Sequence, residues 1–145
     1  MLSSLLSQRV KVDFGGAATG AGTSAVNGSS FSMVGYEGAM FFSRYGTPAA
    51  NNVAKLQQSD DDGVADDWTD LAGSQVVAGA SDENQFVEVF KPTKKFVRPV
   101  FARGTSSTLG EIWCIRYGAR NLPVQNVVSG TTAGKSVASP AEGTA

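Results

Sequence analysis

Short runs in which apolar and polar residues alternate, separated by turns that contain Gly or Pro, are the dominant pattern of the chain. Residues 9–14, RVKVDF, are the first clear case, since every second side chain is apolar. A period of two predicts a half-buried strand. We expect Val10, Val12 and Phe14 to face the core and the charged residues between them to face solvent.

The same pattern returns along most of the chain. Residues 111–117 end the series, with Trp113, Ile115 and Tyr117 on one face of the expected strand. The other predicted strands cover residues 31–45, 53–59, 68–77, 85–91 and 95–103, with bends at Gly35, Gly38 and residues 72–74.

Two of these runs carry a further expectation. Residues 85–91 have apolar side chains on both faces, which is typical of a strand that is covered on both sides. In residues 95–103 we expect Phe96, Val100 and Ala102 to face inward. Pro99 in the same run indicates an edge strand or a bulge, because proline has no N–H to donate.

Regular turn signals and the absence of a long helical period predict an all-β fold, a β-sandwich or jelly roll of about seven or eight short antiparallel strands. The sandwich is expected over residues 9–128, with a long Gly- and Ser-rich loop at 15–30. Residues 1–8 are an N-terminal arm. Residues 129–145 are an extended tail, because their Gly, Ser, Thr and Ala content cannot build a core.

Composition supports this picture. The 145 residues fit one domain, and only 17% of them are charged, which suits short strands and turns. A single cysteine excludes an internal disulfide. No apolar run reaches the length of a membrane span, and the first residues do not form a signal peptide, so we expect no membrane association.

Catalytic chemistry is not expected. The chain has no histidine, which removes the commonest general base and the commonest transition-metal ligand. Ser and Thr are plentiful, but no activating base accompanies them in a recognisable arrangement. Cys114 lies between apolar neighbours and is interpreted as a buried structural thiol. We therefore predict no catalytic residue and no cofactor.

An acidic loop over residues 60–67 raises the question of calcium. An EF-hand is excluded, because aligning Gly63 with the invariant glycine places Gln58 and Thr69 at ligand positions. A looser calcium site built from Asp60, Asp62, Asp66 or Asp67 is one interpretation. Solvated turn residues are the preferred one, so the prediction is no metal.

The charges are unevenly distributed. Residues 60–90 hold nine acids and no Lys or Arg, whereas residues 91–120 hold seven bases and one acid. Solvated turns with weak intramolecular pairs explain this pattern as well as complementary patches that orient subunits in an assembly. The net charge of −1 gives no general attraction to nucleic acid, and no direct nucleic-acid partner is expected.

Four segments together resemble a known family: KLQQSDD at 55–61, WTDL at 68–71, KFVRPV at 95–100 and IWCIRYGAR at 112–120. They are similar to small virion proteins of tailed bacteriophages, and above all to the jelly-roll cement or decoration proteins of the capsid exterior. The resemblance covers roughly residues 53–124. The loop at 15–30 and the tail lie outside it.

The resemblance implies a structural protein, not an enzyme, located on the outside of the virion. It implies binding to the major capsid protein, stabilisation of the shell, and self-association as a dimer or, alternatively, a trimer. The arm, the loop at 15–30 and the tail are candidate contact segments. The individual interface candidates are Leu2, Leu5, Leu6, Lys94, Lys95, Arg98 and Arg103.

The alternative function is a tail- or fibre-associated β-sandwich that binds a carbohydrate or a receptor. Such a protein needs exposed aromatic side chains on a concave face, for which Tyr36, Tyr45 and Trp68 are the candidates.

Overall fold

The computed structural model describes residues 5–139 and 141–144. Leu2, one of the interface candidates, lies outside these residues. Apart from one short 3-10 helix, η1 (Leu6–Gln8), the regular structure is all β. The strands are β1 (Lys11–Gly16), β2 (Thr19–Gly22), β3 (Val26–Asn27), β4 (Phe31–Ser32), β5 (Gly38–Arg44), β6 (Asn52–Ser59), β7 (Thr69–Asp70), β8 (Val76–Val77), β9 (Asn84–Phe90), β10 (Phe96–Arg103), β11 (Ser107–Leu109) and β12 (Ile112–Tyr117).

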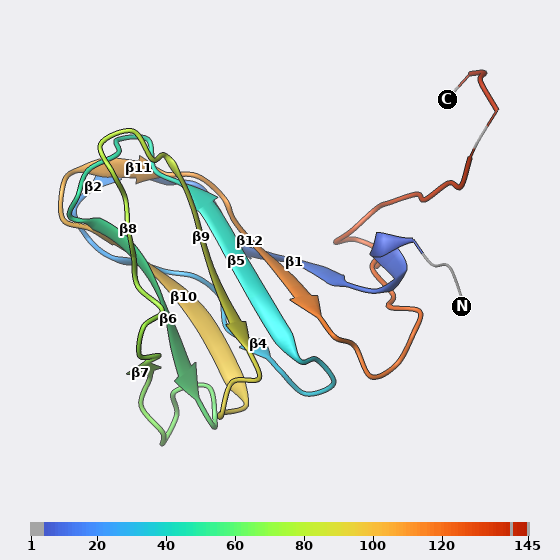
Figure 1. Ribbon diagram of the computed structural model, residues 1–145, viewed down its shortest axis with the longest axis horizontal. Coiled ribbons are helices and arrows are strands. Elements are labelled where there is room, and N and C mark those ends of the chain that lie inside the picture. Colours follow the sequence, from blue (N-terminus) through green and yellow to red (C-terminus); the bar gives the residue numbers. More distant parts are fainter. Residues whose placement is uncertain (1–4, 140, 145) are drawn as a thin grey trace.

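Two antiparallel sheets face each other (Figure 1). The first has the order β1-β12-β5-β9. In the second, β3 and β4 both pair with β10, β10 pairs with β6, and β7 and β8 both pair with β6. β3 and β4 therefore act together as one interrupted strand, and so do β7 and β8. Counted this way, eight strands form two four-stranded sheets with the strand order of a jelly roll, which confirms the predicted fold class.

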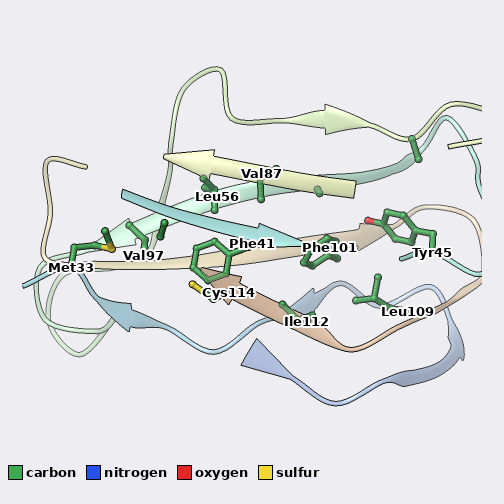
Figure 2. Close-up of a cluster of buried hydrophobic side chains, with 13 residues drawn as sticks. Met33, Phe41, Tyr45, Leu56, Val87, Val97, Phe101, Leu109, Ile112 and Cys114 are labelled. Atoms are coloured by element: carbon green, nitrogen blue, oxygen red, sulfur yellow. The ribbon is translucent and has the colours of Figure 1, made fainter. Parts of the chain in front are cut away.

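The core lies between the sheets. Phe41 from the first sheet and Phe101 and Leu56 from the second are fully buried and point toward one another (Figure 2). Tyr45 closes one end of the core, and its hydroxyl donates to the carbonyls of Val53 (3.0 Å) and Ala102 (2.9 Å). Burial raises the pKa of this phenol.

Cys114 is buried in this core, as its apolar neighbours predicted. Burial, together with the nearby Asp13 carboxylate, raises the pKa of its thiol. Since the thiolate is the reactive form, this position is chemically quiet.

The expected orientation of β1 is wrong for Val12 and Phe14, whereas Val10, which precedes the strand, is buried as expected. Val12 and Phe14 are exposed on the outside of the first sheet, whereas Asp13 lies on the inner side and pairs with Arg116 (Nε–Oδ2 2.8 Å). Alternation shows that the two faces of a strand differ, but it does not show which face meets the second sheet. Here both faces of the first sheet are rich in apolar residues.

The expected orientation of β10 is also wrong. Val97 and Phe101 are fully buried in the core, and Phe96 and Ala102 lie on the opposite face. Val100, the third residue expected to face inward, is buried at 5% exposure. Pro99 is buried in the middle of a strand that is paired on both sides, so it does not mark an edge. The pairing of β10 with β4 and with β3 differs by one residue beside Pro99, which is the bulge that the proline indicated.

Pro99 is tolerated there because β3 and β4 leave a gap beside it. Its carbonyl accepts from Gly28 N (2.9 Å), so its nitrogen also faces that gap, where no ladder bond is needed. Gly28 fills the gap closely, since an added Cβ would lie 2.5 Å from Pro99 Cγ.

The segment at 15–30 is not a structureless loop. It contains β2 and β3, and β2 pairs with β11, a short strand between β10 and β12. Arg103 holds this layer in place, as its guanidinium donates to the carbonyls of Gly20 (2.7 Å), Ser24 (2.8 Å) and Ser107 (2.7 Å).

The residues before β1 and the segment 124–126 lie beside each other and beside β1. Asn126 is the main link: its amide donates to the carbonyls of Ser7 (2.7 Å) and Val10 (2.8 Å) and accepts from Val12 N (2.8 Å). Residues 129–139 are exposed. Ser136 still forms a hydrogen bond with Ser7 (2.6 Å), and the end of the tail runs away from the sandwich (Figure 1). In residues 5–139 and 141–144, no helix has the length and apolarity that crossing a bilayer requires.

Candidate protein-binding surface

The outer face of the first sheet carries a continuous apolar surface. All four strands contribute to it, because every second side chain of each strand points away from the core. We call this surface the apolar face and define it by Val12, Phe14, Met40, Phe42, Phe86, Phe90, Trp113, Ile115 and Tyr117.

Cross-strand register aligns its aromatic residues. Phe14 is opposite Trp113, Trp113 is opposite Phe42, and Phe42 is opposite Phe86, so one aromatic row crosses the whole sheet. The rings of Phe14 and Trp113 meet edge to face, with their centroids 5.3 Å apart. Side chains that are directly opposite in an antiparallel pair contact each other, which makes this row a rigid ridge.

The exposure of this row is greatest at its two ends. Phe14 is 51% exposed and Phe86 is 62% exposed. From strand spacing and rise, the four strands cover roughly 400 Å² in projection. Contiguous apolar patches of this size on soluble proteins commonly mark interaction sites.

Polar groups frame the apolar face. Near one end, Arg44 pairs with Glu83, and these two side chains remain 63% and 39% exposed. On the other side, the Tyr117 hydroxyl donates to Glu88. Burial and this hydrogen bond raise the pKa of Tyr117 to about 12. A hollow of about 570 Å³ lies over the aromatic row, with Phe86 and Trp113 among its lining residues.

The start of the tail lies beside the opposite edge of the face. A second hollow, of about 730 Å³, is lined by Phe14 and Trp113 together with Val128 and residues 131–133. The tail therefore borders the apolar face without covering its aromatic row.

The residues that the sequence indicated as interface candidates do not gather on the apolar face. Leu5 is half-buried and Leu6 exposed, both at the N-terminal end. Arg98 donates to Gln57 and lies over the ring of Trp68 (4.4 Å), on the outer side of the second sheet. Arg103 is 5% exposed and bonded within the chain, so it is a structural residue, not a surface contact.

Lys94 and Lys95 lie elsewhere again. They line a hollow of about 820 Å³ formed by the segments that follow β4, β9 and β12. Lys94 is paired with Asp66 (2.6 Å), and this bond raises the pKa of the lysine and lowers that of the carboxyl. Lys95 lies over the ring of Phe96 (5.2 Å). An acid of the acidic stretch, Asp66, and a base of the basic stretch, Lys94, thus pair within the chain.

The acidic loop is organised by its own hydrogen bonds. Asp61, which was not among the calcium candidates, accepts from the backbone N–H groups of Val64, Ala65 and Asp66, and these bonds lower its pKa. The Asp66 carboxylate accepts hydrogen bonds from the Lys94 ammonium and from Asp60 N (2.8 Å). In the described part of the chain, no three carboxylates gather in a way that could hold a metal ion.

Asp62 and Asp67, the remaining calcium candidates, lie apart in this loop. Asp62 accepts from the Ser30 hydroxyl, and its backbone has a positive φ of 64°. The Asp67 side chain is exposed.

The three aromatic candidates for carbohydrate binding are engaged within the fold. Tyr45 is fully buried. Trp68 is stacked with Arg98, and Tyr36 is stacked with Arg116 at 4.5 Å. The exposed aromatic rings of the molecule are instead those of the apolar face.

A signal for this face exists in the sequence. Residues 85–91 and 111–117 have apolar side chains on both faces. For residues 85–91, this pattern predicts a strand that other parts of the chain cover on both faces. In the structure, Phe86 and Phe90 of β9 are 62% and 58% exposed, so that interpretation is wrong for the chain as described. The same pattern also fits a strand whose second face has no covering layer within its own chain.

No family model and no curated protein matches this chain. Among solved structures, it is similar to the SPBc2 prophage-derived protein YomS, with a TM-score of 0.46 and 10% sequence identity over 80% of this chain and 97% of that one. A likeness of this degree does not indicate a function.

Proposed function

We propose that this chain is a structural protein of a bacteriophage virion that binds the outside of the capsid and stabilises the lattice of the major capsid protein. The observation that carries the proposal is the apolar face, whose aromatic row from Phe14 to Phe86 is open to solvent. Docking this face on a shell removes apolar area from water, which is the main driving force of protein association.

Two further points support the proposal. The jelly-roll strand order is the fold that the resemblance to cement proteins implies, although a fold alone does not determine function. Many copies on a symmetric lattice also raise the overall binding strength well above that of a single contact. A patch of moderate size is therefore sufficient for stable decoration.

The test is co-sedimentation of the purified chain with shells assembled from the major capsid protein. The double variant Phe14→Ser/Phe86→Ser removes both exposed ends of the aromatic row. Its affinity should fall by at least about tenfold, because each buried Phe side chain contributes well over 1 kcal/mol. Val64→Ser is the matched control, as Val64 is 86% exposed on the acidic loop, away from the face.

Binding of the double variant as strong as that of the wild-type chain would contradict the proposal. So would heads that lack the protein and withstand heat as well as heads that carry it.

A carbohydrate- or receptor-binding role is the second candidate, and one observation favours it. The hollow over the aromatic row has Phe86 and Trp113 in its wall and Arg44 and Glu111 at its rim. Aromatic rings beside charged groups suit a sugar as well as a protein side chain. A glycan-array signal that disappears in Trp113→Ala, with no binding to shells, would favour this candidate over decoration.

A further inference from the structure

β9 is an edge strand without the usual protection. It pairs with β5 over all seven of its residues, and no strand among residues 5–139 and 141–144 pairs with its other side. Within the part of the chain that is described, the backbone of residues 85–90 makes no hydrogen bond outside the β5 ladder. A free edge of this length presents unpaired N–H and C=O groups to other chains.

The other edges of the sandwich are protected. At the opposite edge of the same sheet, Asn126 bonds to β1 and to the residues before it, and Lys11 donates to the Gln125 carbonyl (2.8 Å). The edges of the second sheet are broken into strands of two residues each: β3, β4, β7 and β8. Short edge strands and covered edges are the common ways to prevent pairing between chains.

β9 carries a single charged side chain, Glu88. Phe86 and Phe90 point outward and are exposed, and Glu88 between them is engaged by the Tyr117 hydroxyl. From this contrast we infer that β9 pairs with β9 of a second copy about a two-fold axis, which joins two first sheets into one eight-stranded antiparallel sheet.

Charge complementarity selects the register. With Val87 on the two-fold axis, Lys91 of one copy and Glu83 of the second copy come together just beyond the ends of the paired strands, and this pair occurs twice. Lys91 has a positive φ of 51° there, and Glu83 also pairs with Arg44 of its own chain. Phe86 lies opposite Glu88 of the second copy. If Glu88 lay on the axis, the two Glu88 side chains would be opposite each other, and like charges there are unfavourable. If instead the pairing of the two strands slipped by one residue, the apolar faces of the two copies would point to opposite sides of the sheet.

The inferred dimer fits the rest of the molecule. The two-fold axis is perpendicular to the sheet, so both apolar faces point the same way and form one surface about twice as large. The inference does not depend on capsid binding, because it concerns the free protein in solution. Each can fail without the other.

The experiment is sedimentation equilibrium of the purified full chain over a concentration series. We expect a monomer–dimer equilibrium for the wild-type chain. Phe86→Glu places like charges opposite each other twice and should raise the dissociation constant of the dimer by about tenfold. Phe86→Lys places opposite charges there and should preserve the dimer. Both substitutions are on an exposed side chain, so the monomer should fold normally.

Phe14→Lys is the control for a different mode of pairing. Phe14 lies on the apolar face at the far edge of the sheet, and it should not affect a dimer formed through β9. A monomer at every concentration would overturn the inference, as would a dimer that Phe86→Glu leaves intact. If Phe86→Lys or Phe14→Lys weakened the dimer as much as Phe86→Glu does, the inference would also be overturned. That result would indicate a dimer formed between the apolar faces.

A carbodiimide cross-link tests the register directly. In a dimer formed from unlabelled and heavy-isotope-labelled chains, a mixed-isotope peptide that joins Lys91 to Glu83 is expected. A dimer that is cross-linked only through other carboxylates would overturn the register.

Discussion

At the scale of single residues, Arg103 shows how a charged side chain serves the fold. Its three carbonyl partners belong to segments that have little apolar area of their own, namely β2, the turn after it and β11. The sequence could not indicate this role, because a basic residue at the end of a strand is usually exposed. Only the return of residues 19–24 over the end of β10 buries it.

Arg103→Ala should therefore lower the free energy of unfolding by about 3 kcal/mol, since it leaves buried carbonyls without their charged donor. Arg103→Lys should have an intermediate effect, because one ammonium group cannot replace the planar donor fork. Urea unfolding measures both. Arg44→Ala is the control: Arg44 pairs with Glu83 at the surface, and its loss should change the free energy by less than about 1 kcal/mol.

Asp61 should make stability depend on acid pH. Backbone hydrogen bonds hold its pKa below the usual value in the folded state. The folded chain thus binds fewer protons than the unfolded chain near pH 4, and the stabilisation is present above about pH 4 and lost as pH falls through the lowered pKa. Asp66 and Asp70, whose pKa values are lowered by Lys94 and Lys55 respectively, act in the same direction.

Asp61→Asn should lower the melting temperature at neutral pH and flatten its decline in acid. Thermal unfolding followed by circular dichroism at a series of pH values measures this. Asp67→Asn is the matched control, as the exposed Asp67 side chain holds no backbone group of the loop. Equal effects of the two variants would show that total loop charge, not the Asp61 hydrogen bonds, controls stability.

At the scale of elements, the strands with strong alternation were predictable. Residues 53–59 and 85–91 match β6 and β9 within one residue at each end. β2, β3 and β11 were not predicted. The Gly, Ser and Thr residues of β2 and β11 give no hydrophobic period, β3 has only two residues, and all three strands depend on partners distant in sequence. Which face of β1 and of β10 points into the core was also not predicted, because that depends on which face the other sheet covers.

Asn126 should be the element-scale link between the C-terminal segment and β1. Asn126→Ala removes its three hydrogen bonds to the chain before and within β1, and should lower the free energy of unfolding by about 1 kcal/mol or more. Hydrogen exchange should accelerate at the Val12 amide and along residues 124–128. Asn121→Ala, on an exposed residue nearby, should leave both unchanged. Unchanged exchange in Asn126→Ala would contradict this role.

At the scale of the whole molecule, the candidate site could be predicted only in part. The sequence indicated an assembly role but assigned it to charged residues and to flanking segments. The structure places an exposed apolar surface on the outside of the first sheet, and two of its residues, Val12 and Phe14, are ones that the alternation pattern had assigned to the core. The apolar face and the free edge of β9 adjoin each other, so self-association and shell binding would use neighbouring parts of one sheet.

The most direct test of this account is a cryo-electron microscopy reconstruction of capsids to which the purified chain has been added. The account predicts density on the outer surface of the shell, with the apolar face of β1, β12, β5 and β9 against the major capsid protein and the acidic loop after β6 away from it. Density in which the apolar face is turned to solvent, or capsids that carry no added density, would contradict it.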